Sequence, residues 1–268
     1  MSAGIISATY SESLSGKSNH YHDGHQLLYI VKGEADVSVG GQSVTVGDGT
    51  LLLFNKFEEH SILLKSDEYK RYSVRISSDA GVGGKRELLF AVLVNRFPGF
   101  SHAIQSGVYA SALESIFKRL TREYRSNIPF RQEMLDALLR ELLVTVCRLM
   151  PHSPLSEKGE NVKLISRIQQ RFETDYCEAF SLEKLATDYH MSVSYLSHLF
   201  KDITGVSVME YLMACRMQAA KKYLATTDLS IGEIVSACGF SDDSNFSRSF
   251  KARTGQTPTA FRKYYMDN

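Results

Sequence analysis

Near its end the sequence reads SNFSRSFKARTG (residues 244–255), and 50 positions earlier it reads SYLSHLFKDITG (residues 194–205). Phe250, Lys251, Thr254 and Gly255 each follow an identical residue at that same distance. A fixed period of this kind predicts a duplicated supersecondary unit. With two copies of ~50 residues, we expect a tandem of compact modules rather than a solenoid.

Both copies have the same predicted anatomy: a short helix, a tight turn and a second helix that ends at glycine. The repeated phrase follows SLEKLATDYHMS (residues 181–192) in the first copy and SIGEIVSACGF (residues 230–240) in the second. Ser181 and Asp242 suit helix N-caps, while Gly205 and Gly255 suit left-handed C-caps. The positions expected to face inward are Leu196, Leu199, Phe200 and Ile203, then Phe246 and Phe250. Each copy is therefore predicted to be a helix-turn-helix.

The outward faces of the two second helices combine small hydroxyl residues with bases. These faces carry Ser194, Ser197, His198 and Lys201 in the first copy, and Ser244, Ser247, Arg248 and Lys251 in the second. Small residues let a helix approach closely, and the bases supply hydrogen-bond donors and positive charge for double-stranded DNA. A plain helical bundle would explain the inward residues equally well, but it would not explain this repeated outward pattern.

The stretch between the copies, SVMEYLMACRMQAAKKYLATT (residues 207–227), is rich in helix formers. About 20 helical residues rise ~30 Å. Successive major grooves on one face of B-DNA lie ~34 Å apart. A stiff connecting helix would thus hold the two reading helices about one DNA turn apart, which favours the DNA-binding interpretation.

The segment IGEIVSACGFSDDSNFSRSFKARTGQTPTAFRK (residues 231–263) resembles the signature of the AraC/XylS family of bacterial transcription regulators, and the resemblance extends over residues 164–265. It implies that the helices over 193–204 and 242–254 enter adjacent major grooves. The implied base-facing residues are Ser194, Ser197, His198, Ser244, Ser247 and Arg248. Lys201 and Lys251 suit phosphate contacts or packing better. Because serine makes few bidentate contacts, part of the specificity is expected to come from DNA shape.

The composition fits a globular protein without a membrane partner. Charged residues are 23%, apolar residues 43%, and the formal net charge is +1, so polyanion binding must come from a local surface. The sequence shows neither a membrane-spanning run nor a signal-peptide pattern, so we expect a cytoplasmic location. The four cysteines form no CxxC pair, which argues against a disulfide framework or a thiolate metal site.

The pattern of apolar, polar and turn-forming residues changes three times along the chain. The strand-like and helical patterns lie in separate regions, so the predicted fold class is α+β. Residues 1–80 alternate apolar runs with glycine turns, which predicts an antiparallel barrel. Residues 81–150 turn helical, with expected helices that include 86–97. We place a linker at 151–163, which is polar and contains proline, and an all-helical DNA-binding domain at 164–268.

The last predicted helix of the middle region has a continuous apolar stripe. Its residues recur at three- and four-residue steps and are Leu135, Leu138, Leu139, Leu142, Leu143 and Val146. The stripe is interpreted either as the face that packs on the barrel or as a seam for a second copy of the chain.

The N-terminal segment resembles a cupin barrel, with His20, His22, Gln26 and Gly33 in the first motif and NKFEEH (residues 55–60) in the second. In metal-using cupins two His of the first motif, a Glu and a third His bind the metal. Here Gln26 replaces the Glu, and Asn55 and Phe57 replace the usual Pro and Gly. Three interpretations of the histidines stay open: ordinary strand residues, the lining of an effector pocket, or ligands of a divalent metal.

The expected effector-binding side chains are those that strand alternation and the motifs bring together. They are His20, His22, Gln26, Leu28, Phe54, His60, Tyr72 and Arg75, with His20, His22, Gln26 and His60 as the metal candidates. We expect no required cofactor. His25 and His102 are expected on the surface.

These observations predict a sequence-specific transcription regulator of the AraC type, not an enzyme. The resemblance implies a homodimer controlled by a small-molecule effector, with RNA polymerase as a further partner if the protein activates. Two alternatives remain. One is a metal-dependent cupin enzyme with a helical appendage, against which the missing Glu argues, and the other is an AraC-type regulator without a ligand.

Overall fold

A computed structural model describes residues 4–12, 17–20, 22–77, 93, 101–150 and 159–266. Its internal contacts divide the chain into two compact units, whose main boundary along the sequence lies between Lys163 and Leu164. The first unit contains the sheets and the second is helical, so the predicted α+β class is confirmed.

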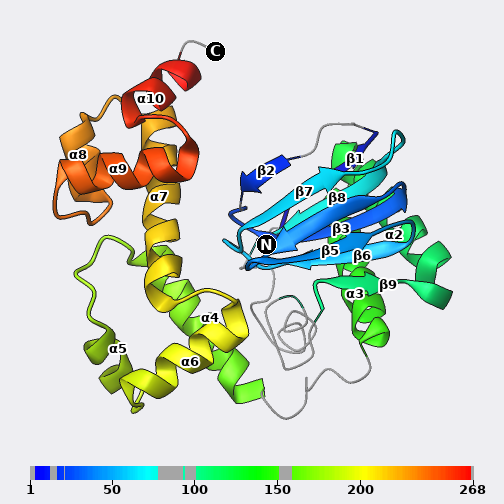
Figure 1. Ribbon diagram of the computed structural model, residues 1–268, viewed down its shortest axis with the longest axis horizontal. Helices are drawn as coiled ribbons and strands as arrows, with labels where there is room; N and C mark the ends of the chain where they lie inside the picture. Colours follow the sequence, from blue (N-terminus) through cyan, green and yellow to red (C-terminus); the bar gives the residue numbers. More distant parts are fainter. Residues whose placement is uncertain are drawn as a thin grey trace. The chain divides into compact units, whose positions relative to one another are not determined.

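Two antiparallel sheets form the first unit (Figure 1). One has the strand order β1-β8-β3-β6-β9 and the other β2-β7-β4-β5. The strands are β1 (Ile5–Ser11), β2 (Lys17–His20), β3 (His25–Lys32), β4 (Ala35–Val39), β5 (Gln42–Val46), β6 (Thr50–Phe54), β7 (His60–Leu64), β8 (Lys70–Ile76) and β9 (Ala103–Gln105). Strand β9 lies in the range predicted to be helical, because three residues are too short to show a period.

The core of the barrel lies between the sheets and follows from the two-residue period of the strands. One cluster of buried apolar side chains fills it: Leu28, Ile30, Ala35, Val37, Val39, Val46, Leu52, Phe54, Ile62 and Tyr69. The β4–β5 hairpin turns at Gly40 and Gly41, whose φ angles of 57° and 81° suit a tight two-residue turn. Its predicted glycine turn is therefore confirmed.

Helices cover the outer face of the five-stranded sheet. After the short 3-10 helix η2 (Gly107–Tyr109), helix α2 (Ala110–Arg125) packs against β1, β3 and β8, and α3 (Arg131–Leu149) packs against α2. The Phe117 ring stacks on Tyr29 with ring centroids 5.7 Å apart and on Tyr72 at 6.0 Å. The helix predicted over 86–97 lies outside the described residues, Leu93 excepted.

The apolar stripe of α3 is buried inside the single chain. Leu135, Leu138, Leu139, Leu142, Leu143 and Val146 are each at most 2% exposed. Of the two interpretations, the internal packing face is the one that this geometry supports. Because these side chains are already buried within one copy of the chain, they are not available to contact a second copy.

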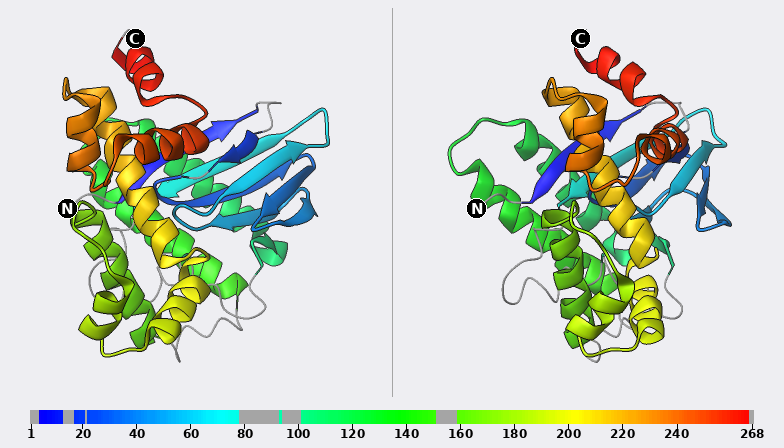
Figure 2. Two further views of the ribbon diagram at one scale, coloured as in Figure 1. Left: turned by 60° about the vertical axis from the view of Figure 1, so that its left-hand side comes forward. Right: turned by 90° about the vertical axis from the view of Figure 1, so that its left-hand side faces the viewer.

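Seven helices make up the described part of the second unit (Figure 2). They are α4 (Gly159–Thr174), α5 (Leu182–Asp188), α6 (Val193–Thr204), α7 (Val208–Thr226), α8 (Ile231–Ala237), α9 (Asp243–Thr254) and α10 (Pro258–Met266). Helix α4 begins at Gly159, so the last residues of the range predicted as linker are helical. Among the described residues, no helix combines the length and the apolar character that a membrane crossing requires.

The structure reproduces the sequence repeat helix by helix. Helices α6 and α9 have 12 residues each and begin 50 positions apart, at Val193 and Asp243. The predicted inward residues are buried, from Leu199 at 8% exposed down to Leu196, Phe200, Phe246 and Phe250 at 0%. Two tandem helix-turn-helix modules are therefore present.

Candidate nucleic-acid interface and a histidine cluster in the barrel

Helix α6 presents most of its predicted reading residues to solvent. Ser194, His198 and Lys201 are exposed, whereas Ser197 is half-buried. The Ser197 hydroxyl donates to the carbonyl of Val193 at 2.8 Å, so it is committed to its own helix. The Nδ1 atom of His198 lies 2.8 Å from the Ser194 carbonyl, which can only accept. Nδ1 therefore carries the hydrogen, and a neutral His198 offers Nε2 as an outward acceptor.

Helix α9 repeats this arrangement. Ser244, Arg248 and Lys251 are exposed and Ser247 is half-buried, as in the first copy. The Asp242 carboxylate accepts from the backbone N–H of Asn245 at 2.6 Å, so the predicted N-cap is confirmed. The Asp242 carboxylate therefore caps the start of α9 and does not belong to its outward face.

Helix α7 connects the modules, with α5 and α6 near one end and α8, α9 and α10 near the other (Figure 1). It runs for 19 residues and begins at a capping box in which Ser207 and Glu210 satisfy each other's backbone N–H groups. A helix of this length rises about 28 Å, close to the ~34 Å of one DNA turn.

Arg216, near the middle of α7, joins the two modules. Its Nε donates to the carbonyl of Tyr176 at 2.8 Å and its NH2 to the carbonyl of Glu178 at 2.9 Å, both in the loop before α5. Its guanidinium also lies 5.9 Å from the ring centroid of Phe240, in the turn of the second module. One side chain therefore contacts elements of both modules.

Gly239 brings the same two elements together at backbone level. Its φ is 74°, and a Cβ at this position would lie 2.7 Å from the carbonyl oxygen of Cys177. No side chain fits without displacing one backbone from the other. The loop of the first module and the turn of the second thus interlock, which fixes how α6 and α9 stand relative to each other.

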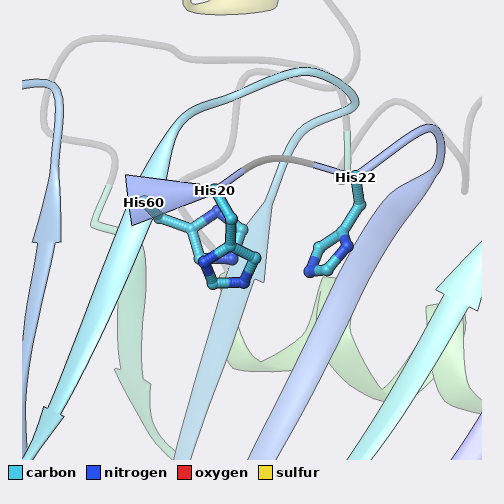
Figure 3. A group of neighbouring side chains, drawn as sticks. All are labelled: His20, His22 and His60. Carbon is cyan, nitrogen blue, oxygen red and sulfur yellow. The ribbon is translucent and has the colours of Figure 1, made fainter. Parts of the chain in front are cut away.

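Three histidines converge at one end of the barrel interior: His20 at the end of β2, His22 just before β3, and His60 at the start of β7 (Figure 3). Their candidate ligand nitrogens all lie within 4.8 Å of one another. The ring centroid of His60 is 4.4 Å from that of His20 and 5.3 Å from that of His22. His60 is 1% exposed and stacks on the core residue Phe54 at 3.8 Å.

The β6–β7 loop positions these histidines. The Nδ1 of His60 lies 2.9 Å from the Glu58 carbonyl, and the N–H of Phe57 donates to the His22 carbonyl at 2.9 Å. Phe57, where the cupin pattern has glycine, has a φ of 63° and is buried. Phe57 therefore occupies a left-handed conformation that glycine adopts more easily.

Two further histidines lie near this loop. His25 is 1% exposed, and its Nδ1 accepts from the N–H of Lys56 at 3.3 Å. The surface position predicted for His25 is therefore wrong, because the loop folds over it. His102 is half-buried, with Nε2 3.0 Å from an oxygen of Glu58.

Gln26 of β3 is linked to the histidine cluster through Phe54, the residue on which His60 stacks. It stands opposite Phe54 of β6, and its Nε2 donates to the hydroxyl of Ser73 at 2.8 Å. Its Oε1 is buried without a hydrogen-bond partner, and the residue is 7% exposed. A buried amide oxygen in this state is an acceptor available to a ligand.

The remaining expected effector residues divide between the two faces of the five-stranded sheet. Leu28 lies in the interior core, and Arg75 shares a face with Gln26 because the two are register partners. Arg75 donates to the Ser7 hydroxyl at 2.8 Å. Tyr72 points to the opposite face, where it packs on Phe117 of α2, so its predicted place in an interior pocket is not supported.

Comparisons with known proteins match both units. A family model described as a cupin domain matches residues 12–74, and one described as a helix-turn-helix domain matches residues 185–264. The Msm operon regulatory protein of Streptococcus mutans is 24% identical over 92% of this chain and 86% of its own length. The HTH-type transcriptional activator RhaR of Escherichia coli is 23% identical over 91% and 86%.

Among solved structures, ToxT from Vibrio cholerae has a similar fold. It matches with a TM-score of 0.60 at 16% identity over 96% of each chain. A structure of the same protein with an unsaturated fatty acid bound matches with a TM-score of 0.55 at 14% identity over 95% of this chain and 93% of that one. At these identities the likeness shows a shared fold.

Proposed function

The chain belongs to the AraC/XylS family of DNA-binding transcription regulators, and from this premise we propose how its two units divide the work. The second unit reads DNA by inserting α6 and α9 into successive major grooves. The barrel holds a small-molecule effector at its histidine end and thereby controls the second unit. The observation that carries the proposal is the pair of matched, exposed reading faces on one interlocked core.

Within the reading faces, the residues take three roles. Arg248 and His198 contact base edges, because they are exposed and offer a donor fork and an imidazole acceptor respectively. Lys201 and Lys251 lie in the last turn of their helices and contact phosphates. Ser194 and Ser244 sit beside the bases, and the half-buried Ser197 and Ser247 let the helices approach closely.

The effector site is supported by the geometry at the histidine end of the barrel. His20, His22 and His60 face one another there, and His60 stacks on Phe54, which belongs to the same apolar core as Leu28. Gln26, the register partner of Phe54, holds a buried acceptor. That a protein of the same fold binds an unsaturated fatty acid supports a ligand-binding role for this unit. An effector acts as a switch only if it binds one arrangement of the protein more tightly than another.

A homodimer is part of the proposal, with its contact placed away from the buried stripe of α3. Ile128 and Phe130, just before α3, are 63% and 79% exposed, and Met134, near the start of α3, is 47% exposed. We define these three residues as the α3 apolar patch and assign it to a second copy of the chain. RhaR is an activator by name, which supports RNA polymerase as a further partner.

The DNA-binding assignment is tested by selecting binding sites from a random duplex library and titrating the best site in gel shifts. Arg248→Ala is expected to weaken specific binding by ~1–3 kcal/mol, because an exposed arginine fork is lost from the base-reading face. The matched control is Arg140→Ala, an exposed arginine on α3 that should leave the affinity unchanged. Equal affinities for the wild type and Arg248→Ala would remove this residue from the reading face.

A further inference from the structure

We propose that His20, His22 and His60 bind one divalent transition-metal ion of the zinc class, and that this ion is the ligand through which the barrel is regulated. The regulatory part rests on the proposed function above, whereas the metal site stands on its own geometry. Three imidazoles from two strands and one loop converge there, and their ligand nitrogens lie within 4.8 Å of one another (Figure 3).

The donor set selects the class of metal. Neutral imidazole nitrogen suits zinc, nickel, cobalt and copper, while magnesium and calcium require oxygen donors, mostly carboxylates. Within the described residues the cluster consists of three histidines and contains no carboxylate. A borderline transition metal is therefore favoured over a hard cation.

The distances allow such an ion after a small adjustment. Zn–N bonds of ~2.0–2.1 Å place tetrahedral ligand nitrogens roughly 3.3 Å apart. His60 is fixed by its stack on Phe54, whereas His20 and His22 are half-buried. In this proposal the rings of His20 and His22 rotate toward His60 when the ion binds.

The surroundings orient the ligands in the manner of a metal site. The Nδ1 of His60 donates to the Glu58 carbonyl, so Nε2 holds the lone pair that faces the other imidazoles. The Glu58 carboxylate is itself held by the N–H of Asn55 at 2.8 Å and by His102 at 3.0 Å. The backbone of His22 is fixed by the N–H of Phe57. Such second contacts lower the cost of assembling the ligands around an ion.

Three protein ligands leave a fourth position of a tetrahedral ion open. We assign the Oε1 of Gln26 to this position, because it is buried, accepts no hydrogen bond and belongs to the register partner of Phe54, on which His60 stacks. It suits either direct ligation or a hydrogen bond from a metal-bound water. An oxygen of an effector molecule can replace that water, so the ion can be the effector itself or the anchor of one.

Bound metal would join β2 and β7 to the segment that leads into β3. These segments come from both sheets, because β2 and β7 belong to the four-stranded sheet and β3 to the five-stranded sheet. The ion therefore cross-links the two sheets at the histidine end and favours whichever arrangement of the barrel holds the three rings together. This differential stabilisation is what a regulatory ligand requires.

The experiment uses the full-length protein after chelator treatment. Zn²⁺ is titrated calorimetrically, Co²⁺ binding is followed by visible absorption, and Mg²⁺ serves as the comparison ion. We expect one Zn²⁺ per chain, a tetrahedral Co²⁺ spectrum and no Mg²⁺ binding. His20→Ala and His22→Ala should each weaken Zn²⁺ binding by at least about 100-fold, since both remove a ligand outright.

The matched control is His190→Asn. His190 is exposed in the second unit at a φ of 56°, a conformation that asparagine tolerates well. This variant loses an imidazole elsewhere and should bind Zn²⁺ like the wild type. A wild type that binds no Zn²⁺, or a His22→Ala variant that binds it equally tightly, would overturn the site.

A variant that is expected to bind Zn²⁺ more tightly distinguishes loss of a ligand from loss of folding, because misfolding cannot strengthen binding. Gln26→Glu introduces a carboxylate beside the cluster and should tighten Zn²⁺ binding by about 10-fold if an ion sits there. Unchanged or weaker binding in a folded Gln26→Glu protein would contradict the placement of the ion.

The regulatory role is measured separately from the site. Gel shifts of the wild type with and without Zn²⁺ should differ, and His22→Ala should lose that difference while it keeps metal-free DNA binding. If Zn²⁺ binds but leaves DNA affinity unchanged, the ion is not the regulatory ligand. If the wild type binds no DNA with or without Zn²⁺, the DNA-reading assignment fails instead, whatever the metal titration shows.

Discussion

The two units arrange their functional side chains in opposite ways. The helical unit exposes its proposed DNA-reading residues, such as Arg248 and His198, on the outside of an interlocked core, whereas the barrel turns His60 and Gln26 inward against apolar side chains. A surface that reads a rigid duplex needs fixed spacing between its probes. A site that responds to a small ligand needs an enclosed cluster of polar atoms. The difference predicts distinct effects of mutation in the two units.

The largest effect is expected from Gly239→Ala, which attacks the interlock of the helical unit. The added Cβ would lie 2.7 Å from the Cys177 carbonyl oxygen at a φ of 74°, so two backbones must separate. We expect a loss of about 2–4 kcal/mol in the unfolding free energy of this unit. Urea unfolding followed by circular dichroism measures the loss, and a shifted helical transition with an unmoved barrel transition is the expected result.

Gly255→Ala is the matched control for this substitution. Gly255 has a φ of 76°, but a Cβ there meets no atom within 4 Å. It should therefore cost only the left-handed conformation, about 1 kcal/mol. If the two variants lose the same unfolding free energy, the close contact between Gly239 and Cys177 does not contribute to stability.

A smaller effect is expected from Arg216→Met, which keeps the apolar stem but removes the donors to the loop before α5. Two hydrogen bonds to backbone carbonyls and the contact with Phe240 disappear. We expect about 1–3 kcal/mol less stability. More tellingly, the variant should discriminate less between operators whose two half-sites are separated by different numbers of base pairs.

Gel shifts with a series of spacer insertions measure this discrimination. Lys222→Met on the same helix is the control, since Lys222 is exposed and loses no such contacts. A steep spacer dependence that survives in Arg216→Met would show that Arg216 does not set the distance between α6 and α9.

The same contrast explains what could be predicted from sequence. The helical unit follows from local signals: the repeated phrase predicted α6 with its observed bounds and α9 to within one residue at its start, and Ser181 and Asp242 cap as expected. The interlock could not be predicted from sequence, because Arg216 contacts Glu178, 38 positions away, and Gly239 contacts Cys177, 62 positions away.

In the barrel the strand pattern predicted the fold but not the direction of each side chain. Tyr72 and Arg75 lie on one strand and face opposite sides, which depends on register rather than on composition. The apolar stripe of α3 was equally ambiguous, since an internal packing face and a dimer seam have the same period. Only the tertiary neighbours of α3 distinguish the two.

The smallest effect on stability is expected from Phe130→Asn in the α3 apolar patch. Phe130 is 79% exposed and has a φ of 62° at the start of α3, a conformation that is strained for phenylalanine and easy for asparagine. Little burial is lost, so the barrel unit should keep its stability or gain up to about 1 kcal/mol.

If the patch contacts a second copy, the Phe130→Asn dimer should nonetheless dissociate about 10-fold more readily, because a central aromatic contributes most to such a contact. Sedimentation equilibrium of the full chain measures this, with Val108→Thr as the control, since Val108 is 94% exposed outside the patch. A variant that is no less stable and dimerises as tightly as the wild type would move the dimer contact to another surface.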